Sequence, residues 1–504
     1  MKQIIRTTVT LLFVSAGISF VGSCSLDEQP SSFIESSAYY QTAQQCIAGL
    51  NSCYIPLKTI YNYTFLIAVE GVTDLMYIKS GTLDAQLDIS PAVPRLGSTM
   101  WRQGYLGIMY SNAVIAGIRR SPLSEEEQAP LLAEGIVMRA FYYWLLTSFF
   151  GDVPFYTQDV ANEQIRTEIA HLGRMPADKI RAYLIEELEQ WVPALDQIRS
   201  SEIADNRCGA AMGWMVMAKL AMWNKEWDAA LRALGHLEAI YGELTEENYP
   251  LSDILWRVKD SPESIFEIRH TYTEGGLSVV SNCACICTPT RSSANDGYTY
   301  DGVVIRELGN SATTWTALRP NPYYYNALMP RNGNDRRTSL NLAWEYDGQA
   351  FANAKTVPWL GPKFWCPGMD NQSDSNNQCI FRYADAVLMQ AECYCELHQW
   401  EESIAYLDKI KARAGIDLYG TFKNKDHLTV EIRKERGREL LGEFQRKFDL
   451  VRWGTWYQEV YNYTDYETLR LNMLPCHEYY PIPDTEVAAS NNALDNDAYA
   501  AYGL

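Results

Sequence analysis

The sequence predicts a mostly α-helical fold in which a helical scaffold carries one loop-rich region. Two observations support this fold class. Apolar residues recur at helical spacing over about 32–270 and again over 379–504. Residues 271–378 differ, because Gly, Pro and Asn occupy 28 of these 108 positions, a composition that favours turns and irregular chain. Long linkers and low-complexity tracts are absent from the sequence, so we expect residues 24–504 to form one architectural unit.

The elements before residue 200 are expected to be mainly helices. The helix over 101–119 places Trp101, Ile108, Asn112 and Ile115 on one face. Asn112 on an apolar face is expected to be buried and hydrogen-bonded to the backbone, because an unsatisfied buried polar group is costly. The other expected elements are a helix over 32–56, loops around a short helix over 61–95, and helices over 134–150 and from 175 to about 198.

An internal repeat follows, in which two segments match at a constant offset of 173 residues. Each copy reads as a helix, a tight turn, a tryptophan and a second helix, a pattern similar to tetratricopeptide hairpins. The offset is far longer than a tetratricopeptide unit of about 34 residues, so the pattern predicts separate units on a shared scaffold and not a continuous solenoid. The first copy contains Ala218, Leu220, Trp227, Asp228, Leu231 and Leu234, and the second Ala391, Cys393, Trp400, Glu401, Ile404 and Leu407.

The spacing of apolar residues over 379–454 predicts three consecutive helices. The first ends near Leu397, and the second ends at Gly415, behind a run of cations that suits the negative end of the helix dipole. The third is expected from about Thr429 to Arg452, with Leu440, Leu441, Phe444, Phe448 and Val451 on its apolar side.

The N-terminus predicts export and lipid attachment. Lys2 and Arg6 precede an apolar run over 7–21, and two small residues stand directly before Cys24. This is the pattern of a signal peptide over 1–23. It resembles a lipobox, in which the cysteine thiol is lipidated (with palmitate as the label to test) and becomes the new N-terminus. The alternative is an ordinary secretory signal followed by an incidental cysteine. Apart from this signal, no segment has about 20 uninterrupted apolar residues, so we expect an anchored protein that does not span the membrane.

The net charge and the cysteine spacing argue against two kinds of partner, nucleic acid and a zinc ion. The net charge of −19 argues against nucleic acid, which requires a basic surface. Cys283, Cys285 and Cys287 alternate, a spacing that predicts a strand or one disulfide. A zinc site is not expected there, because paired Cys-x2-Cys spacing and nearby histidines are both missing. No metal and no cofactor are expected.

Glu435, Glu439 and Glu443 recur every four residues, which raises the question of catalysis. Two carboxylates about 5.5 Å apart could serve a retaining glycosidase. Helical neighbours produce the same spacing without catalysis, and interleaved arginines favour an ion-pair network. The common nucleophile, zinc and phosphate-binding motifs are also missing from the sequence. We therefore expect a protein that is not an enzyme.

Four motifs resemble the SusD/RagB family in order and spacing. They are FRYADAVLMQAECYCEL over 381–397, IKARAG over 410–415, IRKERGRELLGEFQRKFDLVRWG over 432–454 and YYPIPDTEV over 479–487. The resemblance implies a surface lipoprotein that binds a glycan or related nutrient for a SusC-like TonB-dependent outer-membrane transporter. Asp27 and Glu28, just behind Cys24, are similar to the signal for display on the outer leaflet.

Ligand contacts are expected on loops, because the helices use their apolar faces to pack against one another. A sugar site needs flat aromatic faces together with polar groups for hydroxyls. The two irregular regions supply the predicted contacts, which are Asp74, Tyr77, Tyr300, Trp315 and Trp344. Two other functions stay open: a surface glycoside hydrolase, and a tetratricopeptide-type scaffold for protein interactions.

Overall fold

A computed structural model describes most of the chain after residue 38. The described residues are 39–79, 84–204, 207–271, 279–289, 299–300, 303–304, 314–346, 348–351, 356–367, 369 and 372–504. Residues Tyr40–Leu504 form one compact unit. The predicted signal peptide and Cys24 lie outside the described residues.

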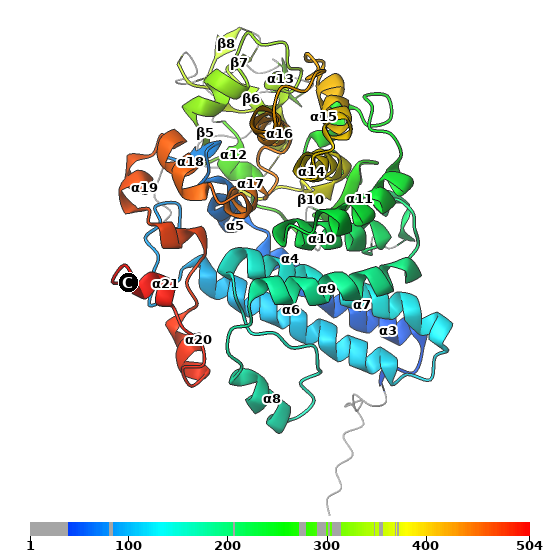
Figure 1. Cartoon of the computed structure of the whole chain (residues 1–504). Coiled ribbons are helices and arrows are strands. Elements are labelled where there is room, and N and C mark those ends of the chain that lie inside the picture. The colour runs from blue at the N-terminus through cyan, green and yellow to red at the C-terminus, as the bar shows by residue number, and fades with distance from the viewer. Residues whose placement is uncertain are drawn as a thin grey trace, which may run out of the picture. The chain divides into compact units, whose positions relative to one another are not determined.

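The fold is mostly helical, as the sequence predicts, and its first helices form a layer at the base of the unit (Figure 1). Helices α6 and α7 lie antiparallel and very close together, because glycines of α6 face bulky side chains of α7. A Cβ atom on Gly107 would lie only 2.3 Å from the ring of Tyr142. Asn112 is buried and accepts a hydrogen bond from Arg139 of α7 at 2.8 Å. The helices up to this point are α3 (Ala43–Leu50), α4 (Ile55–Ile60), α5 (Tyr63–Glu70), α6 (Leu96–Arg119), α7 (Glu125–Phe150), α8 (Glu163–Ala170) and α9 (Ala177–Trp191).

The internal repeat is confirmed as two helical hairpins with matching bounds. They are α10 (Ala210–Trp223) with α11 (Trp227–Tyr241), and α14 (Tyr383–Glu396) with α15 (Trp400–Ala414). The tight turns match as well, since Lys225 and His398 both have a positive φ, 60° and 62°. Helix α11 packs directly on α14, so the hairpins contact each other instead of sitting apart on a separate scaffold (Figure 1).

Three local predictions are wrong. The expected third helix is broken into α16 (Lys425–Glu439) and α17 (Arg446–Arg452), because Gly442 and Phe444 between them adopt positive φ. The first of the three helices was expected to begin at Cys379, but the residues up to Arg382 belong to strand β10 (Gln378–Arg382). This strand pairs with β2 (Ser264–Ile268). The alternating cysteines lie on the short helix α12 (Ala284–Cys287), and the eleven cysteines after Cys24 are all free thiols.

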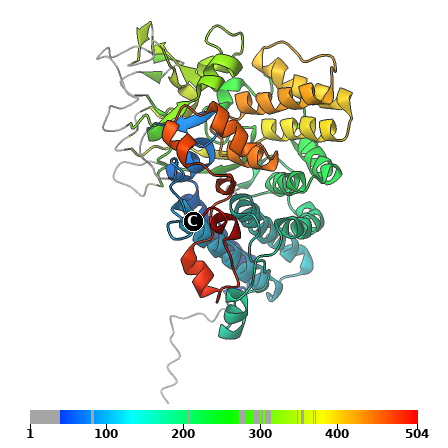
Figure 2. The same ribbon diagram turned by 60° about the vertical axis from the view of Figure 1, so that its left-hand side comes forward.

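The loop-rich region contains only short elements, as expected, and Figure 2 shows its strand pairs away from the α14–α15 hairpin. Strand β5 (Leu318–Pro320) pairs with β1 (Met76–Ile78), which joins this region to the early loop. The remaining strands are β3 (Thr299–Tyr300), β4 (Val303–Val304), β6 (Leu342–Ala343), β7 (Glu345–Tyr346), β8 (Gln349–Ala350) and β9 (Trp359–Leu360), with helix α13 (Thr338–Asn341) and a π-helix over Tyr324–Leu328.

The C-terminal segment adds four short helices beside the loop-rich region and the first helical layer (Figure 1). They are α18 (Trp456–Tyr463), α19 (Glu467–Asn472), α20 (Asp484–Ala489) and α21 (Asp497–Ala500). Short 3-10 turns cover Asn51–Tyr54, Val192–Ala194, Ser200–Glu202, Leu251–Ile254, Pro362–Phe364 and Pro475–Glu478. Within the described chain, no helix is both long enough and apolar enough to cross a lipid bilayer.

A buried charge cluster connects the loop-rich region to the helices. It contains four cations and four carboxylates, all nearly inaccessible to solvent: Arg337, Lys363, Arg382, Arg413, Glu263, Glu435, Glu439 and Glu443. Because the charges balance and are hydrogen-bonded, the cluster can be buried without leaving an unpaired ion. The ion-pair interpretation of the three glutamates is therefore confirmed, although Glu443 lies beyond the end of α16.

Glu439 is the centre of this cluster. It accepts hydrogen bonds from Arg337 and Arg382, both at 2.7 Å, and from Arg413. Burial opposes ionisation of Glu439, but the three guanidinium groups outweigh it and hold its pKa well below the ordinary value. One carboxylate thus connects the loop-rich region, strand β10 and helix α15.

We predict that Glu439→Gln lowers the free energy of unfolding by about 3–5 kcal/mol, the usual effect of removing one partner from a buried ion pair. Chemical denaturation measures this. The matched control is Glu189→Gln, which breaks an exposed pair with Arg232 and should cost under about 1 kcal/mol. Equal stability of the Glu439→Gln variant and the unmodified protein would contradict a structural role for the cluster.

Candidate ligand-binding surface

The pairing of β1 with β5 brings the early loop and the loop-rich region side by side. Both regions were predicted to carry ligand contacts. Tyr77 of β1 is opposite Arg319 of β5. The buried Asn321 fixes this arrangement, because its side-chain nitrogen donates to the carbonyls of Thr73 and Asp74 at 3.0 and 3.1 Å. Its side-chain oxygen accepts from the backbone N–H of Asp465 at 2.9 Å. A single amide side chain therefore connects the early loop, the loop-rich region and the segment after α18.

We name the resulting patch the β1–β5 surface, formed by Tyr77, Arg319, Tyr325, Trp344 and Asp465. Burial raises the pKa of Tyr77 to about 12, and the Asp465 carboxylate beside it adds to the shift. The rings of Tyr325 and Trp344 meet edge to face with centroids 6.1 Å apart. Tyr77, Arg319 and Trp344 are partly exposed and Asp465 is exposed. The surface thus combines aromatic faces with charged groups.

A cleft of about 340 Å³ opens beside Trp344. The guanidinium of Arg331 lies 5.0 Å from the centre of the Trp344 ring and also pairs with Glu345 at 3.0 Å. Asp335 and Thr338 line the same cleft. Its volume is at the lower end of the range for small-molecule sites, and an aromatic wall with a few polar groups is what a sugar ring requires.

Three N–H donors in this area lack an acceptor among the described residues. They are Nε of Arg319 and the indole nitrogens of Trp344 and Trp359. Arg319 lies 3.5 Å from the centre of the Trp359 ring and has no carboxylate partner in the described structure. Burial lowers its pKa to about 10. All three nitrogens are buried, where donors are normally hydrogen-bonded, so they lie beneath the surface and do not themselves provide ligand contacts in this structure.

The structure brings together only some of the predicted ligand residues. Tyr77 and Trp344 belong to the β1–β5 surface. Trp315 is 43% exposed, but its ring packs against Tyr63, with centroids 5.1 Å apart, and among the described residues it makes no ring contact with Tyr77 or Trp344. Tyr300 lies in β3, and its side chain is outside the described part of the structure.

Asp74 is placed differently from the prediction. It is 1% exposed, and both of its carboxylate oxygens pair with Arg446 of α17, at 2.8 and 2.5 Å. A carboxylate that is buried and fully used by an arginine has no oxygen left for a ligand. Its position therefore favours a structural role.

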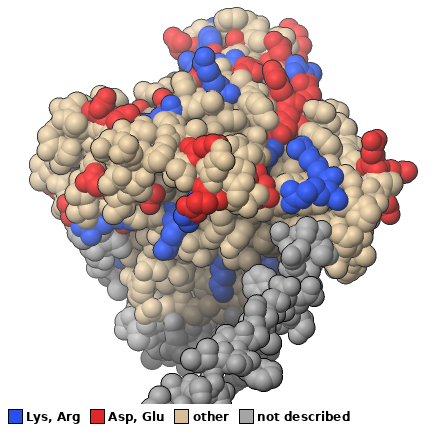
Figure 3. Space-filling view, turned by 90° about the horizontal axis from the view of Figure 1, so that it is seen from below, with Lys and Arg blue, Asp and Glu red and all other residues tan. Residues whose placement is uncertain are grey.

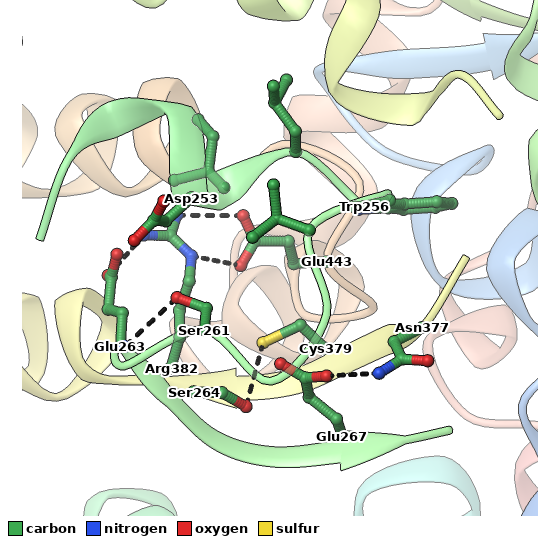
Figure 4. Close-up of a pocket in the computed structure, with 13 residues that line it drawn as sticks. Asp253, Trp256, Ser261, Glu263, Ser264, Glu267, Asn377, Cys379, Arg382 and Glu443 are labelled. Atoms are coloured by element: carbon green, nitrogen blue, oxygen red, sulfur yellow. Dashed lines mark hydrogen bonds and ion pairs between the residues drawn. The ribbon is translucent and has the colours of Figure 1, made fainter. Parts of the chain in front are cut away.

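The carboxylates near the buried charge cluster do not form an accessible catalytic site. Figure 4 shows Glu263 and Glu443 converging on Arg382, and each carboxylate lies 2.8 Å from it. The cavity that they border has a volume of only about 20 Å³, room for about one water molecule. An oligosaccharide cannot reach these groups in this structure.

Charge and metal-binding groups add two further observations. On the face shown in Figure 3, basic and acidic side chains are dispersed among uncharged residues and form no continuous basic band. Among the residues with described positions, no three His, Cys, Asp or Glu side chains are grouped so that they could hold a metal ion.

Sequence reasoning did not select Tyr325 or Asp465 as ligand contacts, and it did not predict that Arg319 lies opposite Tyr77. Tyr325 belongs to a run of three tyrosines, which gives no sign of which ring packs against Trp344. Asp465 is more than 100 residues from the other members of the surface, and the hydrogen bond from its backbone to Asn321 and its side-chain contact with Tyr77 bring it there. The sequence contains no local signal for such a long-range contact.

The chain is similar in sequence to known families and proteins. A sequence model described as the SusD family matches residues 263–499, and another, described as starch-binding and associating with the outer membrane, matches 68–175. SusD-like protein P25 of Formosa agariphila is 27% identical over 94% of this chain and 95% of its own length. The two model matches together cover more than half of the chain.

Solved structures show the same fold. A SusD superfamily protein from Bacteroides vulgatus aligns with a TM-score of 0.72 and 20% identity, over 91% of this chain and 99% of that protein. Surface glycan-binding protein A from Bacteroides thetaiotaomicron, solved in complex with laminarihexaose, aligns with a TM-score of 0.69 and 18% identity, over 90% and 99% of the two chains.

We predict that Asp74→Asn lowers the melting temperature, because it leaves the buried guanidinium of Arg446 without a full charge partner. A thermal melt measures the change. Asp88→Asn, which breaks an exposed pair with Arg95, is the control and should melt like the unmodified protein. An unchanged melt for Asp74→Asn would contradict the structural role assigned to this residue.

Proposed function

This chain belongs to the SusD/RagB family, and we propose that it is a lipid-anchored outer-membrane protein that binds an extracellular glycan and passes it to a SusC-like TonB-dependent transporter. The single observation that carries the binding proposal is the β1–β5 surface, where the partly exposed Trp344 ring lines an open cleft together with Arg331 and Glu345.

The related proteins support this class of ligand. One similar structure is named a laminarin-binding SusD-like protein, and another holds laminarihexaose. These names describe binding and not catalysis, in agreement with a role that is not enzymatic. A β-glucan oligosaccharide is therefore the first ligand to try with this chain.

The geometry suggests how a sugar would bind. The Trp344 ring offers a face for the apolar C–H groups of a pyranose ring, while Arg331 and Glu345 lie close enough to reach its hydroxyls. Arg319 and Asp465 extend the polar contacts towards Tyr77. Trp315 remains a proposed further contact, because it exposes much of its ring.

Attachment to the membrane and display on the cell exterior rest on the sequence. The signal peptide over 1–23 and the lipobox at Cys24 support lipid anchoring, and Asp27 and Glu28 support display on the outer leaflet. The handover to a transporter rests on family membership alone.

We predict that Trp344→Ala weakens glycan binding at least severalfold and changes the melting temperature by only a few degrees. An aromatic face contributes on the order of 0.5–1.5 kcal/mol beyond its buried area, with aromatic pairs as the guide. Isothermal titration calorimetry against a glycan panel that includes laminarihexaose measures the affinity. Trp315→Ala should behave in the same way.

Trp400→Ala is the matched control, since Trp400 is also partly buried but stacks on Phe422 at the α15 hairpin. It should lower the melting temperature and leave glycan affinity unchanged. If the Trp344→Ala and Trp315→Ala variants kept full affinity while their melting temperatures fell sharply, both rings would be structural and the proposed surface would be wrong.

We also predict that Cys24→Ala abolishes palmitate labelling and releases the protein from the membrane fraction. Metabolic labelling followed by fractionation measures both properties. Retention of label and of membrane attachment in this variant would rule out the lipoprotein assignment without affecting the glycan-binding proposal.

A further inference from the structure

A second cleft lies between the start of α9 and the C-terminal segment, and it shares no lining residue with the β1–β5 surface. Its volume is about 420 Å³, within the range for small-molecule sites. We name it the α9 cleft. Its polar lining residues include Asp152, Arg174, Asp178, Arg181, Glu478 and Tyr479.

Arg181 is unusual among the buried arginines of the described structure. Arg139, Arg337, Arg382, Arg413, Arg436 and Arg446 are each paired with a carboxylate. Arg181 is only 5% exposed, yet no carboxylate in the described residues lies within ion-pair distance of it. Its Nη2 donates to the carbonyl of Thr147 at 3.1 Å, and its Nε has no acceptor. A buried and uncompensated guanidinium needs an explanation, because burial disfavours a charge that is not paired.

The surroundings hold Arg181 at the wall of the cleft. Its guanidinium carbon lies 4.5 Å from the centre of the Trp223 ring, which supports the charge from one side. Burial lowers the pKa of Arg181 to about 10, so the group remains a cation at neutral pH. The other cation of the cleft, Arg174, is already used, since it pairs with Asp495 at 3.2 Å and donates to the carbonyl of Asp152.

The remaining lining residues limit the kind of anion that fits. Asp152, Asp178 and Glu478 face the same cleft, so they repel sulfate or phosphate, which carry more negative charge than a carboxylate. They can, however, accept hydrogen bonds from hydroxyl groups. Asp152 keeps one oxygen for this purpose, because the other accepts from the backbone of Ala177 at 2.8 Å. The half-buried ring of Tyr479 provides an apolar contact.

We propose that the α9 cleft binds a sugar acid, with the ligand's single carboxylate on Arg181 and its hydroxyls on the surrounding carboxylates. One planar guanidinium matches one carboxylate, which it can bind through two parallel hydrogen bonds. The acidic rim then selects ligands that also donate hydrogen bonds. This site does not depend on the β1–β5 surface, and it adds recognition of an acidic sugar to a protein proposed to bind glycans.

Calorimetric titration with sodium D-glucuronate tests the proposal on the unmodified protein. We expect saturable binding of glucuronate, and at least tenfold weaker binding of glucose and of the methyl ester of glucuronate, which both lack the charge. Absence of glucuronate binding would overturn the proposal. So would equally tight binding of glucose or of the free amino acid alanine.

Variants locate the site. Arg181→Met should weaken glucuronate binding at least tenfold, and Arg181→Lys should weaken it less, because lysine keeps the charge but loses the planar pair of donors. Arg232→Met, which removes an exposed arginine of α11, is the control and should bind like the unmodified protein. Arg181→Met loses the hydrogen bond to Thr147 and the contact with Trp223 but breaks no ion pair, so it should lower the melting temperature by no more than a few degrees.

The Trp344→Ala variant separates the two sites, since it should keep full affinity for glucuronate while losing affinity for the neutral glycan. Full glucuronate affinity in Arg181→Met, or loss of it in Trp344→Ala, would place the binding elsewhere and refute the assignment to the α9 cleft.

Discussion

Charge compensation around Glu439 is the constraint on which the rest of the structure depends. Three arginines from three different parts of the chain converge on this one carboxylate, far from water. Arg337 precedes α13 in the loop-rich region, Arg382 ends strand β10, and Arg413 lies near the end of α15. Because each charge is costly to bury without its partners, the loop-rich region can take only the position in which all of them meet. The irregular chain thereby acquires a fixed position without extensive secondary structure of its own.

The same principle operates along the rest of α16 and α17. Arg436 pairs with Asp385 of α14, and Arg446 pairs with Asp74 in the early loop. Asp74 in turn adjoins the backbone that Asn321 holds. The β1–β5 surface is therefore supported from below by buried ion pairs and by the hydrogen bonds of the Asn321 amide, while the rings of Tyr77 and Trp344 remain partly exposed. Asp74 belongs to the buried support and Tyr77 to the exposed part of this surface. This explains why Asp74 has a structural role although Tyr77, three residues later, is available to a ligand.

The sequence was sufficient to predict the parts of the fold that depend on local patterns. The repeat at an offset of 173 was found from single residues such as Trp227 and Trp400, and its two hairpins have the expected bounds. Prediction from sequence patterns failed where one or two residues set the backbone conformation. Apolar spacing continues through Leu440 and Phe444, but the positive φ of Gly442 and Phe444 breaks the helix. The site was predicted only in part, because Asp465 and Arg319 reach it through long-range hydrogen bonds and strand pairing.

The central claim is that a glycan binds across the β1–β5 surface. A crystal structure of the protein with the tightest-binding oligosaccharide tests it most directly. We predict a sugar ring stacked on Trp344, with hydroxyls within hydrogen-bond distance of Arg331 or Arg319. A neutral glycan bound at another face, with the Trp344 ring free of contact, would contradict this account.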